Sequence, residues 1–485
     1  VSVMQLKELV KNISFKGQPD CREIKAITYD SRKVKPGTLF VAISGMKDDG
    51  HEYIPQAIEN GAAAVLSNGR SPKTREIPIL QVQDPRMAMS HISAQFYGNP
   101  STKMNIIGVT GTNGKTSITH ILHHILQKSH INCGTLGTLG FHAPSGMIST
   151  GFTTPESIEL QQMLNTLLLA GVTDVVMEIS SHALNLHRVA DVDTNIAVYS
   201  NLTPEHLDFH GDMESYFNSK LKLFTKLNKK NTAVINLDDP YAKRIMAETS
   251  ANIITYGMEK HADLYPLQTK FHLNGIQTKL QCGNIMLSVN SNLVGLYNLY
   301  NIMAAIAVCM AMDIPPEIIS QAMQQSMVIP GRLESISANT PGKIFIDYAH
   351  TPDALKNAIL ALQEHFHKKI TVVFGCGGER DRSKRKLMGK IAKELCNKIY
   401  ITDDNPRNEN SKKIRKEIIK GAKGSKAKEI PGRKKAIIYA LKNSDPHEII
   451  LIAGKGHETY QDIGKKKIFF SDKKIIGDFN SRKIS

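Results

Sequence analysis

A glycine-rich run with one lysine lies between an apolar segment and a helix-like segment near position 110. The apolar segment covers residues 106–109, and apolar residues after position 117 recur at spacings of three and four, which indicates a helix. A strand, a glycine-rich loop and a helix in this order can surround a triphosphate with backbone N–H groups. We therefore expect a nucleotide-binding loop whose lysine contacts the β- and γ-phosphates and whose threonine hydroxyl binds Mg²⁺. Its residues are Gly111, Thr112, Asn113, Gly114, Lys115, Thr116 and Ser117.

Polar clusters with the residue types that bind Mg²⁺ follow this loop. Glu178 comes directly after the apolar run 175–177, and residues 206–212 are rich in histidine and aspartate. A carboxylate, an imidazole and a hydroxyl suit Mg²⁺, a hard cation that also bridges phosphate oxygens. Each residue alone has an ordinary structural explanation, such as a helix cap for Glu178 or a turn for His210. Their position after a phosphate loop favours a metal site beside the nucleotide.

The composition indicates a globular protein of about three domains. The 485 residues are 41% hydrophobic and 22% charged. We find no apolar run of the roughly 18–20 residues that a membrane helix needs, so we expect no membrane partner. The six cysteines are scattered without a C-x-x-C pair, which favours reduced thiols in the cytoplasm over disulfides or a zinc site. We also expect the protein to be a monomer.

The formal net charge is +16, which raises the question of a nucleic-acid partner. The basic residues are spread thinly, only 6% of residues are aromatic and there is no tryptophan, so stacking platforms for bases are scarce. A solvated lysine-rich surface is favoured over a nucleic-acid partner. A basic P-loop ATPase that acts on nucleic acid remains an alternative, which polynucleotide-stimulated hydrolysis and strongly salt-dependent binding would reveal.

Strand-like and helix-like segments alternate along the chain, which is typical of α/β domains with parallel sheets. Many of the apolar runs end in polar residues, and ligands of such sheets bind beyond the carboxyl ends of the strands. Turn signals at 98–102 and 330–331 divide the chain. We expect three domains, at residues 1–100, 101–331 and 332–485.

Seven short motifs stand in order along the chain, at residues 111–116, 153–155, 178–182, 206–211, 298–301, 330–332 and 347–352. Together they resemble the Mur ligases, the ATP-dependent amino-acid-adding enzymes of peptidoglycan synthesis. Within the family they are most similar to the MurE type, which adds the third residue to UDP-N-acetylmuramoyl-L-alanyl-D-glutamate. The resemblance implies an N-terminal UDP-binding domain, a central P-loop ATPase domain with a parallel sheet, and a C-terminal Rossmann-like domain for the amino acid.

The resemblance also implies ATP and Mg²⁺ as ligands of the central domain. The further nucleotide contacts that it implies are Asn301, Arg332 and Asp347. The metal ligands that it implies are Thr116, Glu178, His210 and Lys220, and the catalytic residues are Lys115, Glu178, His210 and Lys220. Lys220 aligns with a lysine that the family carries as a carbamate. An ammonium would repel Mg²⁺, whereas an anionic carbamate can coordinate it.

The implied substrate contacts lie in all three domains. Ser31 matches the uridine-binding segment of the N-terminal domain. For the muramoyl dipeptide the resemblance implies Thr153, Thr154, Ser180 and Arg188. Leu186 stands where some members of the family have a substrate-binding glutamine.

The identity of the added amino acid depends on the tetrapeptide Asp404, Asn405, Pro406 and Arg407. Read alone it is a plausible turn, but within the family it resembles the form that selects meso-diaminopimelate. The planar guanidinium of Arg407 can bind the distal carboxylate of diaminopimelate, a group that lysine lacks, through two hydrogen bonds. Arg380 would contact a substrate carboxylate, and Gly454 and Glu458 would contact the ammonium end.

The resemblance implies an ATP-dependent amide ligase. The D-glutamate γ-carboxylate would attack the γ-phosphorus of ATP, and the amine of diaminopimelate would attack the resulting acyl phosphate. A lysine-adding enzyme, another Mur ligase and a folylpolyglutamate-synthase-like ligase are the alternatives. Comparing phosphate release with diaminopimelate and lysine, and turnover with a folate, would distinguish them.

Overall fold

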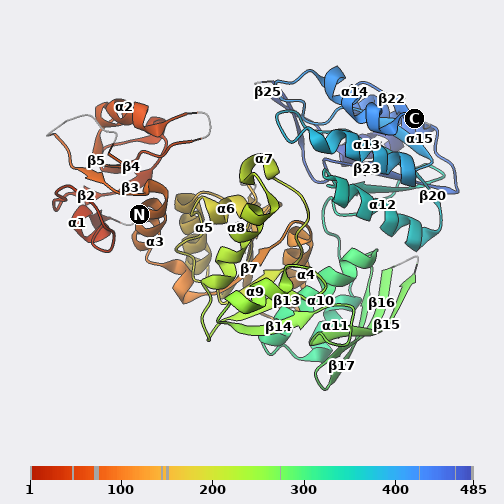
Figure 1. Ribbon diagram of the computed structural model, residues 1–485, viewed down its shortest axis with the longest axis horizontal. Helices are drawn as coiled ribbons and strands as arrows, with labels where there is room; N and C mark the ends of the chain where they lie inside the picture. Colours follow the sequence, from red (N-terminus) through yellow and green to blue (C-terminus); the bar gives the residue numbers. More distant parts are fainter. Residues whose placement is uncertain are drawn as a thin grey trace.

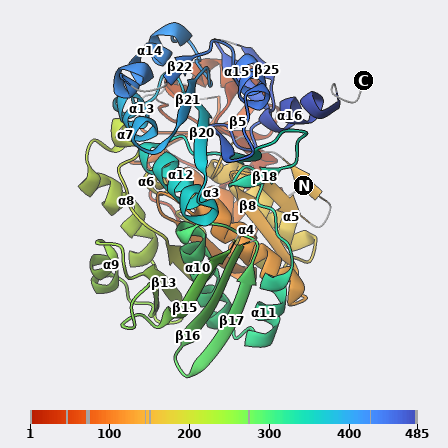
Figure 2. The same ribbon diagram turned by 90° about the vertical axis from the view of Figure 1, so that its right-hand side faces the viewer.

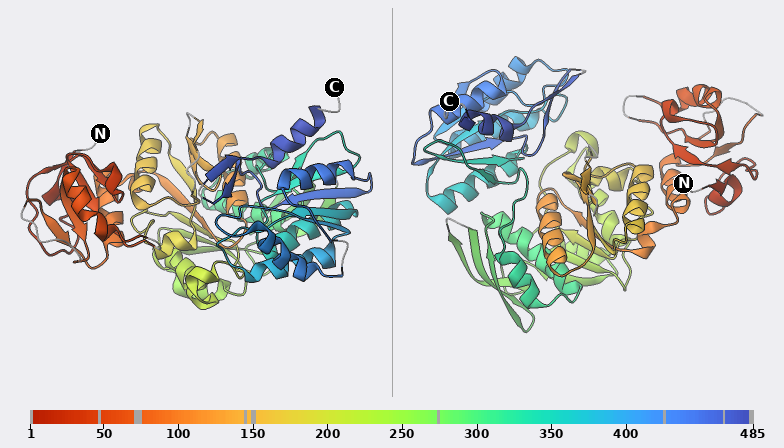
Figure 3. Two further views of the ribbon diagram at one scale, coloured as in Figure 1. Left: turned by 90° about the horizontal axis from the view of Figure 1, so that it is seen from above. Right: turned by 180° about the vertical axis from the view of Figure 1, so that it is seen from behind.

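The computed structural model describes residues 3–45, 48–69, 76–143, 146–148, 152–272, 275–424, 427–464 and 466–481. It shows three α/β domains in a bent row, with the N-terminal and C-terminal domains at opposite ends (Figure 1, Figure 3). The predicted three-domain architecture with a parallel sheet in the central domain is confirmed.

The N-terminal domain is built on a four-stranded parallel sheet in the order β3-β4-β5-β6. Buried apolar side chains such as Leu39, Leu66 and Leu80 pack it against α3. The strands are β3 (Ala26–Thr28), β4 (Thr38–Val41), β5 (Ala62–Ser67) and β6 (Ile79–Gln81), with the pair β1 (Met4–Gln5) and β2 (Glu23–Ile24) beside them. The helices are α1 (Leu6–Leu9), α2 (Ile54–Glu59), α3 (Pro85–Phe96) and the 3₁₀ turns η1 (Ser31–Lys33), η2 (Gly50–Tyr53) and η3 (Pro100–Lys103).

The central domain has an eleven-stranded sheet whose middle strands are parallel and buried on both faces. Two-sided burial requires helices on both faces. Helices α4 (Lys115–Lys128), α10 (Leu296–Ala311) and α11 (Pro316–Gln324) share one apolar core. Helices α5 (Ser157–Leu169), α6 (Ser181–Asn185), α8 (Met213–Thr225) and α9 (Ala242–Glu248) share the other, and the short α7 (Leu207–His210) lies near α8.

The order of this sheet is β10-β9-β8-β11-β7-β12-β13-β14-β15-β16-β17. Its parallel strands are β8 (Cys133–Gly137), β11 (Asp174–Glu178), β7 (Asn105–Thr110), β12 (Ile196–Tyr199), β13 (Thr232–Asn236), β14 (Asn252–Tyr256) and β15 (Leu264–His272). Antiparallel strands β9 (Gly140–Ala143), β10 (Gly146–Ile148), β16 (Gly275–Cys282) and β17 (Ile285–Ser291) extend both edges, a feature that the sequence analysis did not predict. Strands β15–β17 lie at the opposite end of the molecule from α14 and β22 (Figure 2).

The C-terminal domain has a six-stranded sheet in the order β18-β19-β23-β20-β21-β22, and only β18 is antiparallel. The strands are β18 (Glu334–Ile336), β19 (Lys343–Asp347), β23 (Glu448–Ala453), β20 (Lys369–Phe374), β21 (Lys398–Ile401) and β22 (Ala427–Glu429), and a hairpin is formed by β24 (Tyr460–Ile463) and β25 (Lys466–Phe469). One face is covered by α12 (Pro352–Phe366), α13 (Ser383–Leu395) and α14 (Ser411–Ala422), the other by α15 (Arg433–Lys442) and α16 (Asp472–Ser481).

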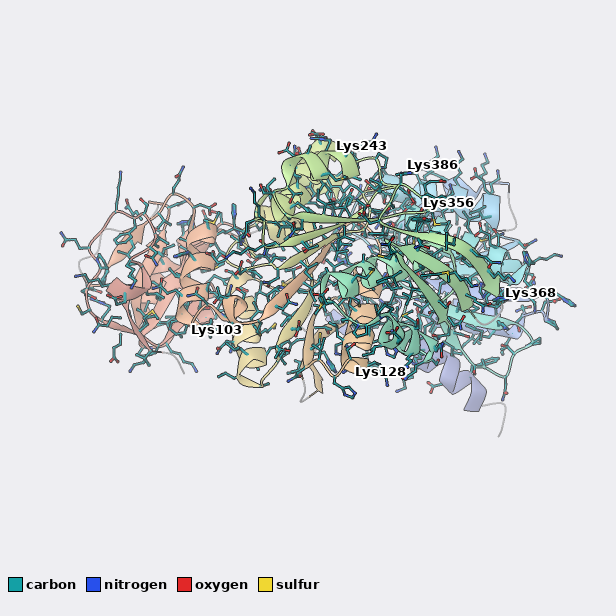
Figure 4. All side chains as sticks on the ribbon, turned by 90° about the horizontal axis from the view of Figure 1, so that it is seen from below. Lys103, Lys128, Lys243, Lys356, Lys368 and Lys386 are labelled. Carbon is teal, nitrogen blue, oxygen red and sulfur yellow. The ribbon has the colours of Figure 1, made fainter. Side chains whose placement is uncertain are left out.

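The excess positive charge is distributed over the surface. The lysines labelled in Figure 4 are spread along the molecule: Lys103 ends η3, Lys128 and Lys243 lie on the central domain, and Lys356, Lys368 and Lys386 lie on the C-terminal domain. Within the described ranges, no helix is both long enough and apolar enough to cross a bilayer.

Candidate active site

The phosphate loop connects β7 to α4 at the carboxyl end of the central sheet. Gly111 has a φ of 144°, and a Cβ there would lie 1.9 Å from Ser200 Oγ, so glycine is required. The end of the neighbouring strand fixes the loop: Asn113 N–H donates to Asn201 Oδ1 at 2.9 Å, and Ser200 Oγ donates to the Asn113 carbonyl at 2.6 Å. This arrangement leaves the first N–H groups of α4 at the sheet edge, where a phosphate would bind.

Lys115 begins α4, and its side chain folds back over the loop. Its Nζ donates to the carbonyls of Gly111 at 2.9 Å and Thr112 at 2.8 Å. Burial lowers the pKa of Lys115, and the nearby carboxylates of Glu205 and Glu178 act in the opposite direction. Both acceptors are neutral carbonyls, so this cation is available to a phosphate at the same place.

Glu178 joins the phosphate-loop helix to the neighbouring strand. Its carboxylate, at the end of β11 and 1% exposed, accepts from the hydroxyl of Thr116 at 3.1 Å and from the N–H and hydroxyl of Thr138 at 2.8 and 3.0 Å. The guanidinium of Arg332 donates to the Thr116 hydroxyl at 3.0 Å. Two of the predicted metal ligands, Thr116 and Glu178, therefore lie in direct contact.

The third predicted metal ligand, His210, faces hydroxyl groups. Its Nε2 lies 3.0 Å from Ser181 Oγ and its Nδ1 lies 3.3 Å from Ser219 Oγ. Burial, followed by the charge of His206, lowers the pKa of His210 to about 4. Because both ring nitrogens are engaged by hydroxyls here, metal binding by His210 stays a prediction.

Lys220 brings a buried amine to the same loop from α8. Its side chain is 1% exposed, its Nζ donates to the Gly111 carbonyl at 2.8 Å, and it lies 4.6 Å from the centre of the Tyr216 ring. Burial, reinforced by the positive charge of Lys115, holds the pKa of Lys220 well below its ordinary value. Burial therefore works against the charged form of the amine at this position.

The C-terminal domain reaches the phosphate loop through residues that the sequence analysis did not single out. Asn113 Nδ2 donates to Asp353 Oδ2 at 2.8 Å, and His350 Nε2 lies 3.4 Å from Glu205 Oε1. His206 Nε2 lies 3.7 Å from the same Glu205 oxygen. The signals were present, because His206 begins the His/Asp-rich segment, Glu205 directly precedes it and Asp353 directly follows the motif at 347–352.

The predicted adenosine and phosphate contacts lie beside this contact between domains. A Cβ on Gly114 would lie 2.5 Å from Asn301 Oδ1, which places that amide next to the phosphate loop. Asp347 accepts from the N–H groups of Leu333 and Ala349, each at 2.7 Å. Burial raises the pKa of Asp347, and the neighbouring Arg332 opposes the rise. Asn301 and Arg332 thus lie against the phosphate loop and the start of α4, whereas Asp347 supports the segment that carries Arg332.

The residues predicted for the muramoyl dipeptide form a second group in the central domain. Thr154 Oγ1 donates to the Glu178 carbonyl at 2.9 Å and accepts from Ser180 N–H at 3.1 Å. Arg188 donates to the Thr154 carbonyl at 3.0 Å, and Thr153 Oγ1 lies 3.1 Å from Thr138 Oγ1. This chain of contacts connects the predicted dipeptide site to the Glu178 carboxylate.

Ser31 lies apart from that group, in the N-terminal domain. It begins η1, is 7% exposed and donates to Gln56 Oε1 at 2.8 Å. The two domains are joined by Tyr29, whose hydroxyl donates to Glu159 at 3.1 Å, and by Arg86, which pairs with Glu156 at 3.1 Å.

A third group follows strands β21 and β23 of the C-terminal sheet and contains Asp404, Asn405, Pro406, Gly454 and Glu458. Asn405 Nδ2 donates to Glu458 Oε2 at 3.0 Å. Gly454 has a φ of 113°, and a Cβ there would lie 2.6 Å from Asp404 Oδ2, so glycine is required for this close approach.

The two arginines predicted to bind carboxylates differ in their surroundings. Arg407 has a φ of 51°, its N–H donates to the Asp462 carbonyl at 3.0 Å, and its guanidinium donates to the Gly378 carbonyl at 2.5 Å. Arg380 is exposed on the neighbouring loop. The structure therefore brings the predicted site residues together in three groups and leaves Ser31 in the N-terminal domain and Arg380 at the surface.

Comparisons with known proteins cover the whole of this architecture. Three family descriptions match in succession: "Mur ligase family, catalytic domain" at residues 23–97, "Mur ligase middle domain" at 109–309, and "Mur ligase, glutamate ligase domain" at 331–456. A similar relative from Caldanaerobacter subterraneus subsp. tengcongensis is 41% identical over 477 residues, which cover 98% of each chain. Another from Syntrophomonas wolfei is 40% identical and covers 99% of this chain and 100% of the relative. Both are named UDP-N-acetylmuramoyl-L-alanyl-D-glutamate--2,6-diaminopimelate ligase.

Solved structures of Mur ligases are also similar to this chain over most or all of its length. A structure of a UDP-N-acetylmuramoyl-L-alanyl-D-glutamate--2,6-diaminopimelate ligase is 30% identical, covers 100% of both chains and has a TM-score of 0.71. A MurF ligase from Thermotoga maritima in complex with ADP shares the fold at 20% identity with a TM-score of 0.64. With matches over its full length to relatives of this similarity, the chain belongs to the Mur ligase family.

Proposed function

We propose that this Mur ligase joins meso-diaminopimelate to UDP-N-acetylmuramoyl-L-alanyl-D-glutamate at the expense of ATP. The observation that carries the proposal is the Asp404–Arg407 tetrapeptide, which packs against Gly454 and Glu458 and places the Arg407 guanidinium 3.8 Å from the Asp462 carboxylate. A diamino acid with two carboxylates offers ammonium groups to the acids and a distal carboxylate to Arg407. The names of the full-length relatives support the same substrates.

The reaction needs activation, because a carboxylate has no good leaving group. The γ-carboxylate of D-glutamate attacks the γ-phosphorus of ATP, the bond to the β-phosphate oxygen breaks, and ADP leaves. The amine of diaminopimelate then attacks the carbonyl of the acyl phosphate, loses a proton and expels phosphate as the amide forms. The protein contributes positioning and charge: the phosphate-loop N–H groups and Lys115 bind the phosphates, and Arg332 at the Thr116 hydroxyl adds a second cation.

The predicted Mg²⁺ site fits the residues that are present. Glu178 supplies a buried carboxylate within 3.1 Å of the Thr116 hydroxyl, and both are oxygen donors of the kind that Mg²⁺ prefers. Thr116 and Glu178 would hold the ion, with His210 as the further predicted ligand. When bound, Mg²⁺ neutralises charge on the phosphate oxygens. Thr138 orients the carboxylate through its two hydrogen bonds.

The carbamate on Lys220 is also part of the proposal. A carbamate forms when a neutral amine attacks CO₂ and releases a proton, and burial beside Lys115 favours the neutral amine. The resulting anion would lie among the cations of the phosphate loop, where it compensates their charge. Among the residues that the structure describes, the amine donates to a neutral carbonyl and has no carboxylate in direct contact.

The dipeptide would lie along Thr153, Thr154, Ser180 and Arg188, with its uridine at Ser31. The hydrogen bonds from Thr154 and Thr153 towards Glu178 and Thr138 support this route, because they lead from the dipeptide group to the phosphates. We propose that the enzyme acts as a cytoplasmic monomer, with the six thiols free as they are in the structure.

One experiment tests the function: ADP formation from ATP, Mg²⁺ and the UDP-muramoyl dipeptide with each of meso-diaminopimelate, L-lysine and no amino acid. We expect ADP and a new amide with diaminopimelate, low turnover with L-lysine, and none without an amino acid. Equal turnover with lysine would instead establish a lysine-adding enzyme, and turnover with a folate substrate would establish a folylpolyglutamate-synthase-like ligase.

A further inference from the structure

Lys455 is a fully buried cation in the middle of the C-terminal group. It follows Gly454 at the end of β23, the central strand between β19 and β20, and its side chain is 0% exposed. Burying an ammonium is costly unless partners compensate its charge and fill its donor positions. A lysine at this position therefore needs a reason beyond packing.

The partners of Lys455 are two of the residues predicted to bind the amino acid. Its Nζ donates to Asn405 Oδ1 at 2.9 Å and to Glu458 Oε2 at 2.8 Å, and it lies 4.0 Å from Asp404 Oδ1. Asn405 Nδ2 donates to the same Glu458 oxygen at 3.0 Å. The ammonium, the amide and the carboxylate thus form a closed ring of three hydrogen bonds.

This ring determines which way the Asn405 amide points. Its Oδ1 accepts from Lys455 and from the N–H of Asp462 at 3.0 Å. Because both groups are donors, the amide oxygen and not the amide nitrogen points towards them. The amide nitrogen is then turned towards Glu458. Without the ammonium, one of these two donors is lost and the Glu458 oxygen loses its nearest cation.

The ring also sets the charge of the site. Asp404 and Glu458 are two carboxylates that face the Lys455 ammonium, and the nearby Arg433 is balanced by Asp472 at 2.7 Å, so a single negative charge is left over. Burial works against the Asp404 carboxylate, but Lys455 and Arg433 outweigh it and keep the pKa of Asp404 below its ordinary value. One excess negative charge suits one substrate ammonium, and a site of two uncompensated buried carboxylates would be expensive to maintain.

We propose that Lys455 is a positioning residue for the amino-acid substrate, because it fixes the Asn405 amide and the Glu458 carboxylate that receive the ammonium end. The inference rests on the proposed function, since it assigns the group around Asp404 to a diamino acid. Lys455 itself does not contact the substrate; it acts through Asn405 and Glu458.

The test compares Lys455→Met with wild-type enzyme under saturating ATP and dipeptide, at varied diaminopimelate. We expect the KM for diaminopimelate to rise at least tenfold, while the affinity for ADP, measured by calorimetry, stays within twofold. Lys398→Met is the matched control, because Lys398 is also on the C-terminal sheet and pairs with Glu448 at 2.8 Å, but is 37% exposed and away from the site. The control should leave the KM within twofold of wild type.

A second variant covers the case in which Lys455→Met does not fold. In Lys455→Met with Glu458→Gln, the methionine no longer contacts the Glu458 carboxylate, and the KM of the double variant should exceed that of Glu458→Gln alone by less than threefold. An independent tenfold effect of Lys455→Met on the Glu458→Gln background, or an unchanged KM in the single variant, would overturn the proposal. Loss of ADP binding together with diaminopimelate binding in both variants would also overturn it, as a general loss of structure. A wild-type enzyme that is inactive with diaminopimelate would refute the proposed function instead.

Discussion

The side-chain amide of Asn113 in the phosphate loop donates a 2.8 Å hydrogen bond to the carboxylate of Asp353, 240 residues away at the start of α12. The same carboxylate accepts from Asn357 at 3.2 Å and from Thr203 at 3.5 Å. A contact between the nucleotide loop and the C-terminal domain couples nucleotide binding to the position of that domain. Domain closure over the phosphate loop would exclude water, which hydrolyses acyl phosphates.

Replacing Asp353 with alanine should weaken this contact between domains. A hydrogen bond to a charged group is worth about 1.5–3 kcal/mol, so the closed arrangement should lose roughly tenfold or more in its equilibrium population. X-ray scattering with ADP bound should show a larger radius of gyration than wild type. Glu364→Ala, at an exposed position on the same helix, is the control. Identical scattering profiles for Asp353→Ala and wild type would contradict the assignment.

Glu178→Gln should abolish most of the activity and preserve nucleotide binding in the absence of metal. The amide removes the anionic oxygen that would bind Mg²⁺ but retains an acceptor for Thr138. We expect kcat to fall at least 100-fold, and ADP affinity measured with EDTA to stay within threefold. Glu214→Gln changes a carboxylate of the same domain that is 57% exposed, and it should have no effect. Full activity of Glu178→Gln would rule out this metal ligand.

The activity should depend on dissolved CO₂ through Lys220. If the buried amine carries a carbamate, enzyme kept in CO₂-depleted buffer should lose activity, and bicarbonate should restore it. A ¹³C signal in the carbamate region should develop with ¹³C-bicarbonate in wild type and be missing in Lys220→Arg. Activity that is indifferent to CO₂, with no such signal, would show that the free amine is the working form.

Much of the fold could be predicted because the sequence makes its parallel strands short, apolar and followed by polar residues. The apolar runs 106–109 and 175–177, for example, lie within β7 and β11, and Glu178 ends β11 as the polar signal indicated. The edge strands β15–β17 were missed because exposed and buried positions mix there, with β15 mostly exposed beyond its first residues. A half-exposed hairpin gives a weaker hydrophobic pattern than a buried strand.

The residues of the candidate site could be predicted from the sequence, but only some of the contacts between them could. Motif order identified Thr116 and Glu178, and the sheet brings them together because β7 and β11 are neighbours. The contact of Asn113 with Asp353 depends on how two domains meet, which no local pattern encodes. Lys455 resembles an ordinary surface lysine in a sequence of net charge +16, and only its burial distinguishes it.

Acid should destabilise the C-terminal domain through Glu409. This carboxylate accepts two hydrogen bonds from Arg385, a fully buried guanidinium, and these bonds lower the pKa of Glu409 to about 2. A lowered pKa in the folded state gives stability that is complete above the unfolded value of 4.5 and is lost as the pH falls towards 2.

Glu409→Gln should therefore lower the free energy of unfolding at pH 7 by about 2–3 kcal/mol, and the difference from wild type should shrink as the pH falls from 4.5 to 3. Urea unfolding at pH 7 and at pH 3 measures this difference in the free energy of unfolding. Glu394→Gln, at a side chain that is 56% exposed, should change stability by less than about 0.5 kcal/mol at either pH. A stability difference that does not vary with pH would show that Glu409 stabilises the fold by something other than its charge.

Arg407 should determine the choice between diaminopimelate and lysine. Its backbone is held by hydrogen bonds to Asp462 and Gly464. Its guanidinium lies 3.8 Å from the Asp462 carboxylate, which is too far for a strong ion pair.

A guanidinium that is held in place but not tightly paired can bind a substrate carboxylate through two hydrogen bonds, which a shorter or uncharged side chain cannot reproduce. Arg407→Ala should lower kcat/KM for meso-diaminopimelate by about 10- to 150-fold, because a hydrogen bond to a charged group is worth about 1.5–3 kcal/mol. The low turnover of L-lysine should remain within threefold, since lysine has no distal carboxylate to lose. Arg382→Ala, at an arginine that is 58% exposed, should leave both substrates unaffected. Equal losses of kcat/KM with both substrates would show that Arg407 maintains the loop and does not bind the distal carboxylate.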